Sequence, residues 1–223
     1  MKTGDGSFTI HLPALNEQYH SKHGALQEAL HVFIAMGLQA FMEIPLSRKR
    51  NYHQQPLQIT EYGLGTGLNA LLTYKYAKEL PIEYTGIEAF PISQEEVRAM
   101  DYGSLLEVPT IYLGIHAAPS GKEMFLSENF QLLKVEEKFE SYTAPHSADI
   151  VYYDAFGPRT QPELWMPEIF QNTYEVLKPG GFLVTYCAQG QARRNMQSAG
   201  FTVERLPGPP GKREMLRATK PSV

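Results

Sequence analysis

Glu61-Tyr-Gly-Leu-Gly-Thr-Gly-Leu-Asn69 is the stretch that decides the fold of this 223-residue chain. It follows an apolar run at Leu57 and Ile59 and precedes residues 70–77, which can form a helix. This order is typical of a β-strand, a glycine turn and an α-helix. Glycines at alternate positions let the backbone bend sharply against a ligand, and the new helix offers free N–H groups to polar or anionic atoms. The turn therefore predicts a site for a small nucleoside-type cofactor.

The spacing of the glycines narrows the class of cofactor. Gly63, Gly65 and Gly67 form a Gly-x-Gly-x-Gly pattern, and an acid, Glu61, lies two residues before the first of them. Folds that bind dinucleotides carry Gly-x-Gly-x-x-Gly around a pyrophosphate instead. The pattern thus favours S-adenosylmethionine.

A second acid supports a nucleoside site. Residues 83–88 alternate like a strand and end in Glu88, 21 positions after Gly67. A carboxylate in this position can accept hydrogen bonds from both ribose hydroxyls, so we predict that Glu88 binds the ribose. The structural alternative is that the glycines only tighten a turn and that Glu88 caps a helix beginning near Ser93.

Composition bounds the class of protein. Apolar residues make up 43% of the chain and charged residues 20%, as in ordinary soluble globular proteins. No stretch approaches the roughly 20 apolar residues of a membrane span. The N-terminus lacks an apolar signal core, and the single cysteine, Cys187, cannot form an internal disulfide. We therefore expect a cytoplasmic protein with one structural domain.

The charge is distributed unevenly. The net charge of −4 argues against a protein whose whole surface binds nucleic acid. Residues 189–223, however, hold seven Lys or Arg and two Glu, and residues 48–53 form a second basic cluster that includes Tyr52. These two faces could hold an RNA. For each cluster the alternative is an ordinary solvated surface.

Hydrophobic periodicity predicts alternating strands and helices. The expected helices are 25–41, 67–79, 93–101, 163–177 and 189–199. The expected strands are the one before the glycine turn and 82–88, 130–136, 149–153, 181–186, 201–206 and 213–219, with residues 103–128 irregular. This order predicts an α/β fold: a mostly parallel seven-stranded sheet with an antiparallel C-terminal strand and helices on both faces, as in class I methyltransferases. Residues 1–50 are expected to be an N-terminal extension whose helix covers the cofactor site, and residues 51–223 the methyltransferase domain.

A candidate catalytic acid follows the strand at 149–153. The run 152–158, Tyr-Tyr-Asp-Ala-Phe-Gly-Pro, places Asp154 at the carboxyl end of that strand, where ligands of such sheets bind. We expect Asp154 to face the methyl group of the cofactor, to hold an amine acceptor and to receive or relay its proton. Phe156 would pack beside the acceptor. A capping role for Asp154 is the alternative.

No metal site is predicted. The spacing of the N-terminal histidines fits no ligand set, although one of them, His20, could lie near the cofactor. Trp165 is expected to be a core anchor rather than a platform for stacking a base. The histidines concerned are His11, His20, His23 and His31.

Over nearly its whole length the chain resembles a known family, the methyltransferase domain of the MnmC tRNA-modification enzymes and its free-standing relatives, called MnmD. The most specific motifs are Asp-x-Phe-x-Pro at 154–158, followed by Trp165, and Lys212-Arg-Glu-Met215. Further matching segments are 5–7, 19–21, 24–28, 61–69, Glu88-Ala-Phe-Pro91, Lys178-Pro-Gly-Gly181 and 199–202.

The resemblance implies a reaction and a site. The reaction is N-methylation, from S-adenosylmethionine, of the aminomethyl group on C5 of a wobble uridine or 2-thiouridine in tRNA. Glu61, Asn69, Ala89 and Asp154 would join the glycines and Glu88 in the cofactor site. The tRNA anticodon loop would lie against Pro158, Lys212 and Arg213, its target base extruded from the stack.

The resemblance also implies partners. A separate enzyme would supply the amine, because no flavin-dependent oxidase domain is expected here, and neither a membrane nor DNA is an expected partner. The family has an acid that contacts adenine near the third strand, where this chain reads Leu133-Lys-Val-Glu-Glu137, so Glu136, Glu137 or neither would serve.

Three competing functions remain open. A methyltransferase or aminopropyltransferase acting on a small amine would use the same fold and the same acid. A degenerate module that only binds S-adenosylmethionine or RNA is opposed by the intact glycines, Glu88 and Asp154. A nicotinamide oxidoreductase is opposed by the spacing of the glycines.

Overall fold

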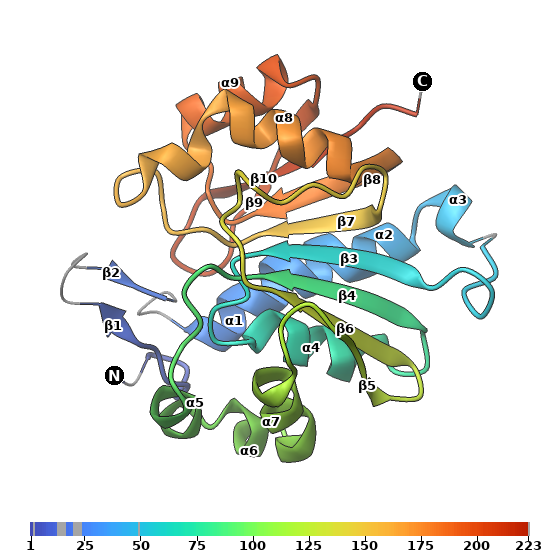
Figure 1. Ribbon diagram of the computed structural model, residues 1–223. Coiled ribbons are helices and arrows are strands. Elements are labelled where there is room, and N and C mark those ends of the chain that lie inside the picture. The colour runs from blue at the N-terminus through green and yellow to red at the C-terminus, as the bar shows by residue number, and fades with distance from the viewer. Residues whose placement is uncertain (2, 13–16, 20–23, 49, 223) are drawn as a thin grey trace.

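A computed structural model describes residues 1, 3–12, 17–19, 24–48 and 50–222 of the chain (Figure 1). Its centre is an eight-stranded sheet with the order β5-β6-β4-β3-β7-β8-β10-β9. The strands are β3 (Leu57–Tyr62), β4 (Ile82–Ile87), β5 (Glu123–Ser127), β6 (Phe130–Val135), β7 (Ala148–Tyr153), β8 (Leu177–Thr185), β9 (Thr202–Pro207) and β10 (Glu214–Thr219). A separate antiparallel pair joins β1 (His11–Leu12) to β2 (Glu17–Gln18).

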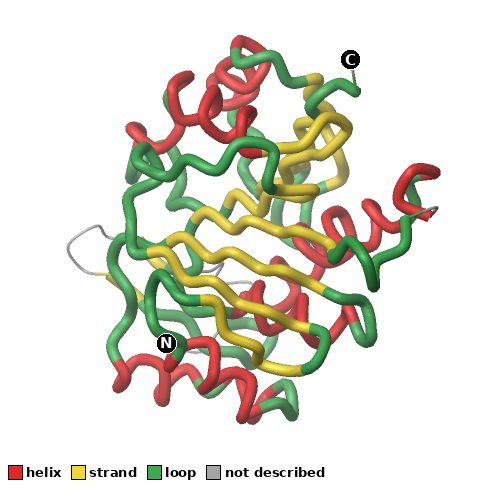
Figure 2. Tube along the Cα trace, turned by 45° about the vertical axis from the view of Figure 1, so that its right-hand side comes forward, coloured by secondary structure: helices red, strands yellow, loops and turns green. Residues whose placement is uncertain are grey.

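The helices lie on both faces of the sheet (Figure 2). One continuous helix precedes β3 and consists of α1 (Ala25–Ala29), a π-helical stretch η1 (Leu30–Gln39) and α2 (Ala40–Met42). The others are α3 (Pro45–Arg48), α4 (Leu68–Ala77), α5 (Gln94–Met100), α6 (Tyr102–Leu105), α7 (Pro109–Ala117), the 3₁₀ turn η2 (Pro162–Trp165), α8 (Pro167–Val176) and α9 (Gly190–Ser198).

The strands are buried on both faces because two hydrophobic cores enclose them. Successive side chains of a strand point to opposite faces. On β7, Ile150 and Tyr152 therefore join the core under the first helix and α4, whereas Val151 and Tyr153 join the core under α8 and α9. The five central strands from β6 to β8 pair in parallel, so their carboxyl ends meet at one edge.

The predicted fold class is confirmed, with one strand more than expected. The antiparallel pairing of β10 with β8 and of β9 with β10 matches the prediction. The prediction that residues 103–128 are irregular is wrong, because they form α6, α7 and β5. β5 is an edge strand paired antiparallel with β6, and its side chains are half-buried or exposed, so it carries little of the apolar signal that marks a strand.

Two predicted elements have different bounds. The helix expected at 163–177 is divided at Met166, where Pro167 begins α8 after the 3₁₀ turn η2. The strand expected at 181–186 begins at Leu177, with a register shift against β7 between Ala148 and Ile150.

The first helix is apolar enough to need an explanation. By length and composition alone, Ala25–Met42 passes as a membrane span, with 18 residues and a mean hydropathy of 1.3, whereas the sequence led us to expect no such stretch. Its contacts give a different explanation. Val32, Phe33, Ile34 and Leu38 are at most 2% exposed, in the core that also contains Tyr152 of β7 and Val184 of β8. The helix is therefore a core helix that packs against the sheet. The division of the chain into an N-terminal extension, residues 1–50, and a methyltransferase domain, residues 51–223, stays a prediction.

Candidate active site

The glycine turn follows β3 at the carboxyl edge of the sheet. Gly63, Gly65 and Gly67 have φ angles of +95°, +46° and +70°, in the left-handed region that favours glycine. A Cβ atom on Gly63 would lie 2.7 Å from the backbone oxygen of Asp154, and one on Gly65 would lie 3.0 Å from the Tyr19 ring. The turn thus passes between the end of β7 and the N-terminal segment with no room for side chains.

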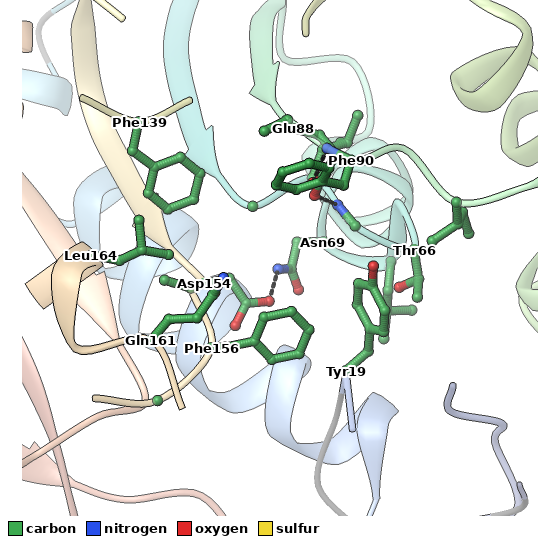
Figure 3. Close-up of a pocket in the computed structure, with 18 of the residues that line it drawn as sticks. Tyr19, Thr66, Asn69, Glu88, Phe90, Phe139, Asp154, Phe156, Gln161 and Leu164 are labelled. Atoms are coloured by element: carbon green, nitrogen blue, oxygen red, sulfur yellow. Dashed lines mark hydrogen bonds between the residues drawn. The ribbon is translucent and has the colours of Figure 1, made fainter. Parts of the chain in front are cut away.

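Glu88, at the end of β4, is held against this turn. Its Oε2 accepts a hydrogen bond from the Gly65 N–H at 2.9 Å, and its Oε1 accepts one from the Phe90 N–H, also at 2.9 Å (Figure 3). Burial raises the pKa of Glu88, and the two hydrogen bonds oppose that rise. The carboxylate is therefore held in one orientation at the cavity wall.

Asn69, in the first turn of α4, joins two carboxyl groups. Its Nδ2 donates to Glu61 Oε1 at 2.7 Å and to Asp154 Oδ2 at 2.8 Å. The second oxygen of Glu61 accepts a hydrogen bond from the Tyr84 hydroxyl at 2.8 Å. Glu61 is completely buried, and burial followed by the charge of Asp154 raises its pKa well above the usual value. Among the described residues, the buried Oδ1 of Asn69 has no hydrogen-bond partner.

Asp154 is the titratable group at the centre of the site. Burial raises the pKa of Asp154 from 3.8 to about 7; the Asn69 hydrogen bond and the charge of Lys212 oppose the rise, and the charge of Glu28 adds to it. A carboxyl group with a pKa near neutral can accept or return a proton at working pH.

These groups surround a cavity of about 870 Å³ (Figure 3). Aromatic rings form part of its wall, and the Tyr19 and Phe156 rings meet edge to face with centroids 5.1 Å apart. The volume suits a nucleoside-sized ligand together with part of a second molecule. The lining includes Gln18, Tyr19, Glu28, Gly63, Gly65, Asn69, Glu88, Ala89, Phe90, Lys138, Phe139, Asp154, Phe156, Gln161, Leu164, Tyr186 and Lys212.

Most of the predicted site residues meet in this cavity, but four do not line it. Glu61 lies beneath the cavity and orients Asn69, while Gly67 is the N-cap residue of α4. Pro158 is half-buried away from the lining, and the side chain of Arg213 is exposed. The structure therefore separates Lys212, which enters the cavity, from its neighbour Arg213.

Phe139 and Leu164 were not predicted. Phe139 comes from the loop after β6 and Leu164 from the 3₁₀ turn η2, and together they form an apolar wall (Figure 3). Neither Glu136 nor Glu137 lines the main cavity; Glu136 lines a smaller one of about 270 Å³ behind the glycine turn. The only signal for Phe139 was an apolar residue among charges after the third predicted strand.

The remaining candidates lie elsewhere or have structural roles. Trp165 is buried as expected, and its Nε1 donates to the Phe156 backbone oxygen at 2.8 Å, which holds the loop that carries Phe156. His11 is exposed, and His31 Nε2 lies 2.8 Å from the Pro207 backbone oxygen. His20 and His23 lie outside the described residues. Within the part of the chain that the structure describes, no three His, Cys, Asp or Glu side chains are grouped to hold a metal ion.

The cavity fits S-adenosylmethionine. Glu88 offers a carboxylate for ribose hydroxyls, and Phe139 and Leu164 offer an apolar wall for a base. At the inner end lies the Asp154 carboxyl group, to which Asn69 donates a hydrogen bond.

Comparison with known proteins agrees with this fit. Residues 120–221 match the family described as S-adenosyl-L-methionine-dependent methyltransferase. The chain is similar to two proteins named tRNA 5-methylaminomethyl-2-thiouridine biosynthesis bifunctional protein MnmC. The one from Leptospira interrogans is 30% identical over 97% of this chain and 34% of its own length, and the one from Cupriavidus necator is 30% identical over 93% and 32%.

A solved structure gives the same result. The crystal structure of MNMC2 from Aquifex aeolicus superposes with a TM-score of 0.71 at 25% identity, over 100% of this chain and 71% of that one. The chain spans about a third of the length of the MnmC relatives it matches. Taken with the fold and the cavity, these matches show that the chain is an enzyme of the class I S-adenosylmethionine-dependent methyltransferases and belongs to the family of the MnmC methyltransferase domain.

Proposed function

We propose that this enzyme methylates the amine of a 5-aminomethyl group on the wobble uridine, or 2-thiouridine, of tRNA. The product would carry a methylaminomethyl group. The observation that carries the proposal is the Asp154 carboxyl group, which lines the cofactor cavity with a pKa of about 7. The names of the relatives support tRNA as the substrate.

A primary alkyl amine is largely protonated at neutral pH, so its nitrogen must lose a proton before it can act as a nucleophile. Asp154 would accept that proton on a carboxylate oxygen and hold the nitrogen by a hydrogen bond. Asn69 keeps the carboxylate turned towards the cavity. When bound, S-adenosylmethionine supplies an electrophilic methyl group on a positively charged sulfur.

The aromatic walls would supply positioning and exclude water. Tyr19 and Phe156 form a ring pair beside Asp154, where an extruded uracil ring can pack (Figure 3). Most of the rate acceleration in a methyl transfer comes from aligning nucleophile and methyl group in a dry site. Phe156 is therefore assigned to the acceptor and Glu88 to the cofactor ribose.

The tRNA itself would contact basic side chains outside the cavity. Arg213 is exposed beside the cavity residue Lys212, and Arg194 adds a positive charge on α9. Such contacts bind the phosphate backbone without reading sequence. We place the enzyme in the cytoplasm with tRNA, where a separate enzyme would make the amine.

The test is transfer of labelled methyl groups from S-adenosylmethionine to three acceptors. These are tRNA with 5-aminomethyluridine, the same tRNA without the amine, and free small amines such as spermidine. We expect label only on the modified base of the first tRNA, and no label with Asp154→Asn as the enzyme. Label on the small amines alone would support the small-amine function, and no label on any acceptor despite cofactor binding would refute the proposal.

A further inference from the structure

Of the two adjacent basic residues Lys212 and Arg213, Lys212 lines the cavity and Arg213 does not. Its Nζ lies 2.6 Å from Glu28 Oε2 and 3.8 Å from the centroid of the Tyr186 ring. The Lys212 side chain is 33% exposed and that of Glu28 only 13%. A lysine whose charge is used in this way is poorly placed to contact phosphate.

The loop that carries Lys212 is built to hold it there. The Lys212 N–H donates to the Pro209 backbone oxygen at 2.9 Å, and the Gly208 N–H donates to the Arg213 backbone oxygen at 3.1 Å. The end of β9, just before this loop, is joined to the first helix, because His31 Nε2 is within hydrogen-bond distance of the Pro207 backbone oxygen. The ion pair therefore adds to this hydrogen bond in joining the hairpin to the first helix.

Tyr186 connects this pair to the catalytic loop. The hydroxyl of Tyr186 donates to the backbone oxygen of Ala155, the residue after Asp154, at 2.8 Å. The Lys212 ammonium thus lies on a ring that is fixed beside the catalytic carboxyl group. Glu28, Tyr186, Lys212 and Asp154 all line the one cavity.

The two charges of the pair act on Asp154 in opposite directions. Glu28 raises the pKa of Asp154 and Lys212 lowers it, while burial is the largest cause of the rise. The pair would also affect a cationic amine in opposite ways, since an unpaired lysine would repel it and an unpaired glutamate would hold it away from Asp154. Glu61 of β3 lies beneath Asp154. The other titratable groups that line the cavity come from the segments after β2, β4, β6 and β8, from α5 and from η2; they are Tyr19, Glu88, Glu96, Lys138, Glu140, Glu163 and Tyr186.

We propose that Lys212 and Glu28 are positioning residues of the methyl transfer, an ion pair that balances the charge around Asp154 so that a protonated amine can enter and give its proton to that carboxylate. Lys212 acts through Asp154, whereas RNA contact belongs to Arg213. This inference rests on the proposed amine acceptor.

The test compares the pH dependence of kcat and of kcat/KM for Lys212→Gln, Glu28→Gln, the double variant and Lys212→Arg. Activity requires ionised Asp154, so it rises with pH through the pKa of Asp154. This rise is the acidic limb of the pH–activity profile. Lys212→Gln should move the acidic limb to higher pH by about 1 pH unit, and Glu28→Gln should move it to lower pH by a similar amount. The double variant and Lys212→Arg should return it close to wild type.

Arg213→Gln is the matched control, because it removes the same charge from the adjacent, exposed position. It should raise the KM for tRNA and reduce the salt dependence of binding, with the acidic limb unmoved. If Lys212→Gln behaves in this way instead, Lys212 is an RNA contact and the inference fails. Binding of S-adenosylmethionine with wild-type affinity verifies that each variant is folded.

If Lys212→Gln does not fold, the Glu28→Gln variant alone tests the inference. An acidic limb that stays in place or moves to higher pH in this variant would overturn it. A wild-type enzyme that is inactive on tRNA with 5-aminomethyluridine would refute the proposed function. An active wild-type enzyme with unmoved limbs in every variant would overturn this inference alone.

Discussion

The two ends of strand β7 each carry an aspartate, and the two side chains have opposite surroundings. Asp149, near the start, lies 2.8 Å from Arg50 Nη1 and 3.0 Å from Lys178 Nζ, and it accepts the Gln58 N–H at 2.9 Å. Asp154, just past the end, accepts a hydrogen bond from the neutral Asn69, and burial raises its pKa to about 7. Charge pairing makes the first a structural group, whereas no described cation forms an ion pair with the second, which leaves it available for proton transfer.

The largest expected effect is on catalysis. Asp154→Asn keeps the shape of the side chain and its place beside Asn69 but cannot accept a proton. We expect kcat to fall about 10³-fold, within the range for loss of a general base, with unchanged affinity for S-adenosylmethionine. Single-turnover methyl transfer and calorimetric cofactor titration measure the two quantities. A parallel loss of cofactor affinity would show that the two roles are not separable.

The next effect concerns the other end of the strand. Asp149→Asn leaves Arg50 and Lys178 without their counter-charge, and these side chains are only 17% and 28% exposed. We expect the free energy of unfolding to fall by about 2 kcal/mol, less than for a fully buried pair because water reaches both cations. Denaturant unfolding measures this change. Activity per folded molecule should be retained, and its loss would mean that the amino edge of the sheet also affects the site.

A smaller effect is expected at the cofactor. Glu88→Ala removes the carboxylate that the Gly65 and Phe90 N–H groups orient. Affinity for S-adenosylmethionine should fall by about 1–3 kcal/mol, the scale of charge-assisted hydrogen bonds. Glu95→Ala is the control, because Glu95 is exposed on α5 outside the cavity. Equal affinities of the two variants would remove Glu88 from the binding site.

The smallest expected effect concerns the pH dependence of stability, in which the two aspartates should also differ. The pKa of Asp154 is raised on folding from 3.8 to about 7, so the stability that its protonated form contributes is fully present below pH 3.8 and lost as pH rises through 7. Asp154→Asn does not titrate. Between pH 3.8 and 7, the free energy of unfolding of this variant should therefore rise by about 1 kcal/mol relative to that of the wild type. The expected rise is small because water in the cavity partly hydrates the carboxylate. Unfolding midpoints at several pH values measure the difference, and a flat difference would contradict the raised pKa.

The same contrast shows why sequence predicted some features and missed others. The basic run 48–53 was considered as an RNA contact, yet Arg50 is paired with Asp149, a partner distant in sequence. Lys212 and Arg213 are adjacent in sequence but differ in environment, since one enters the cavity and the other faces solvent. Tyr19 and Phe139 reach the cavity from segments that are distant in sequence, so their meeting there depends on how the chain folds.

By itself the sequence determined the alternating α/β order, the glycine turn and the acids after the strands, because these depend on local backbone geometry and on the period of apolar residues. The tertiary structure decided which charges are neutralised. Asp149 meets two cations and Asp154 meets an amide, since pairing depends on which distant segments pack together. The placement of Lys212 against Glu28 likewise arises only when the C-terminal hairpin docks on the first helix.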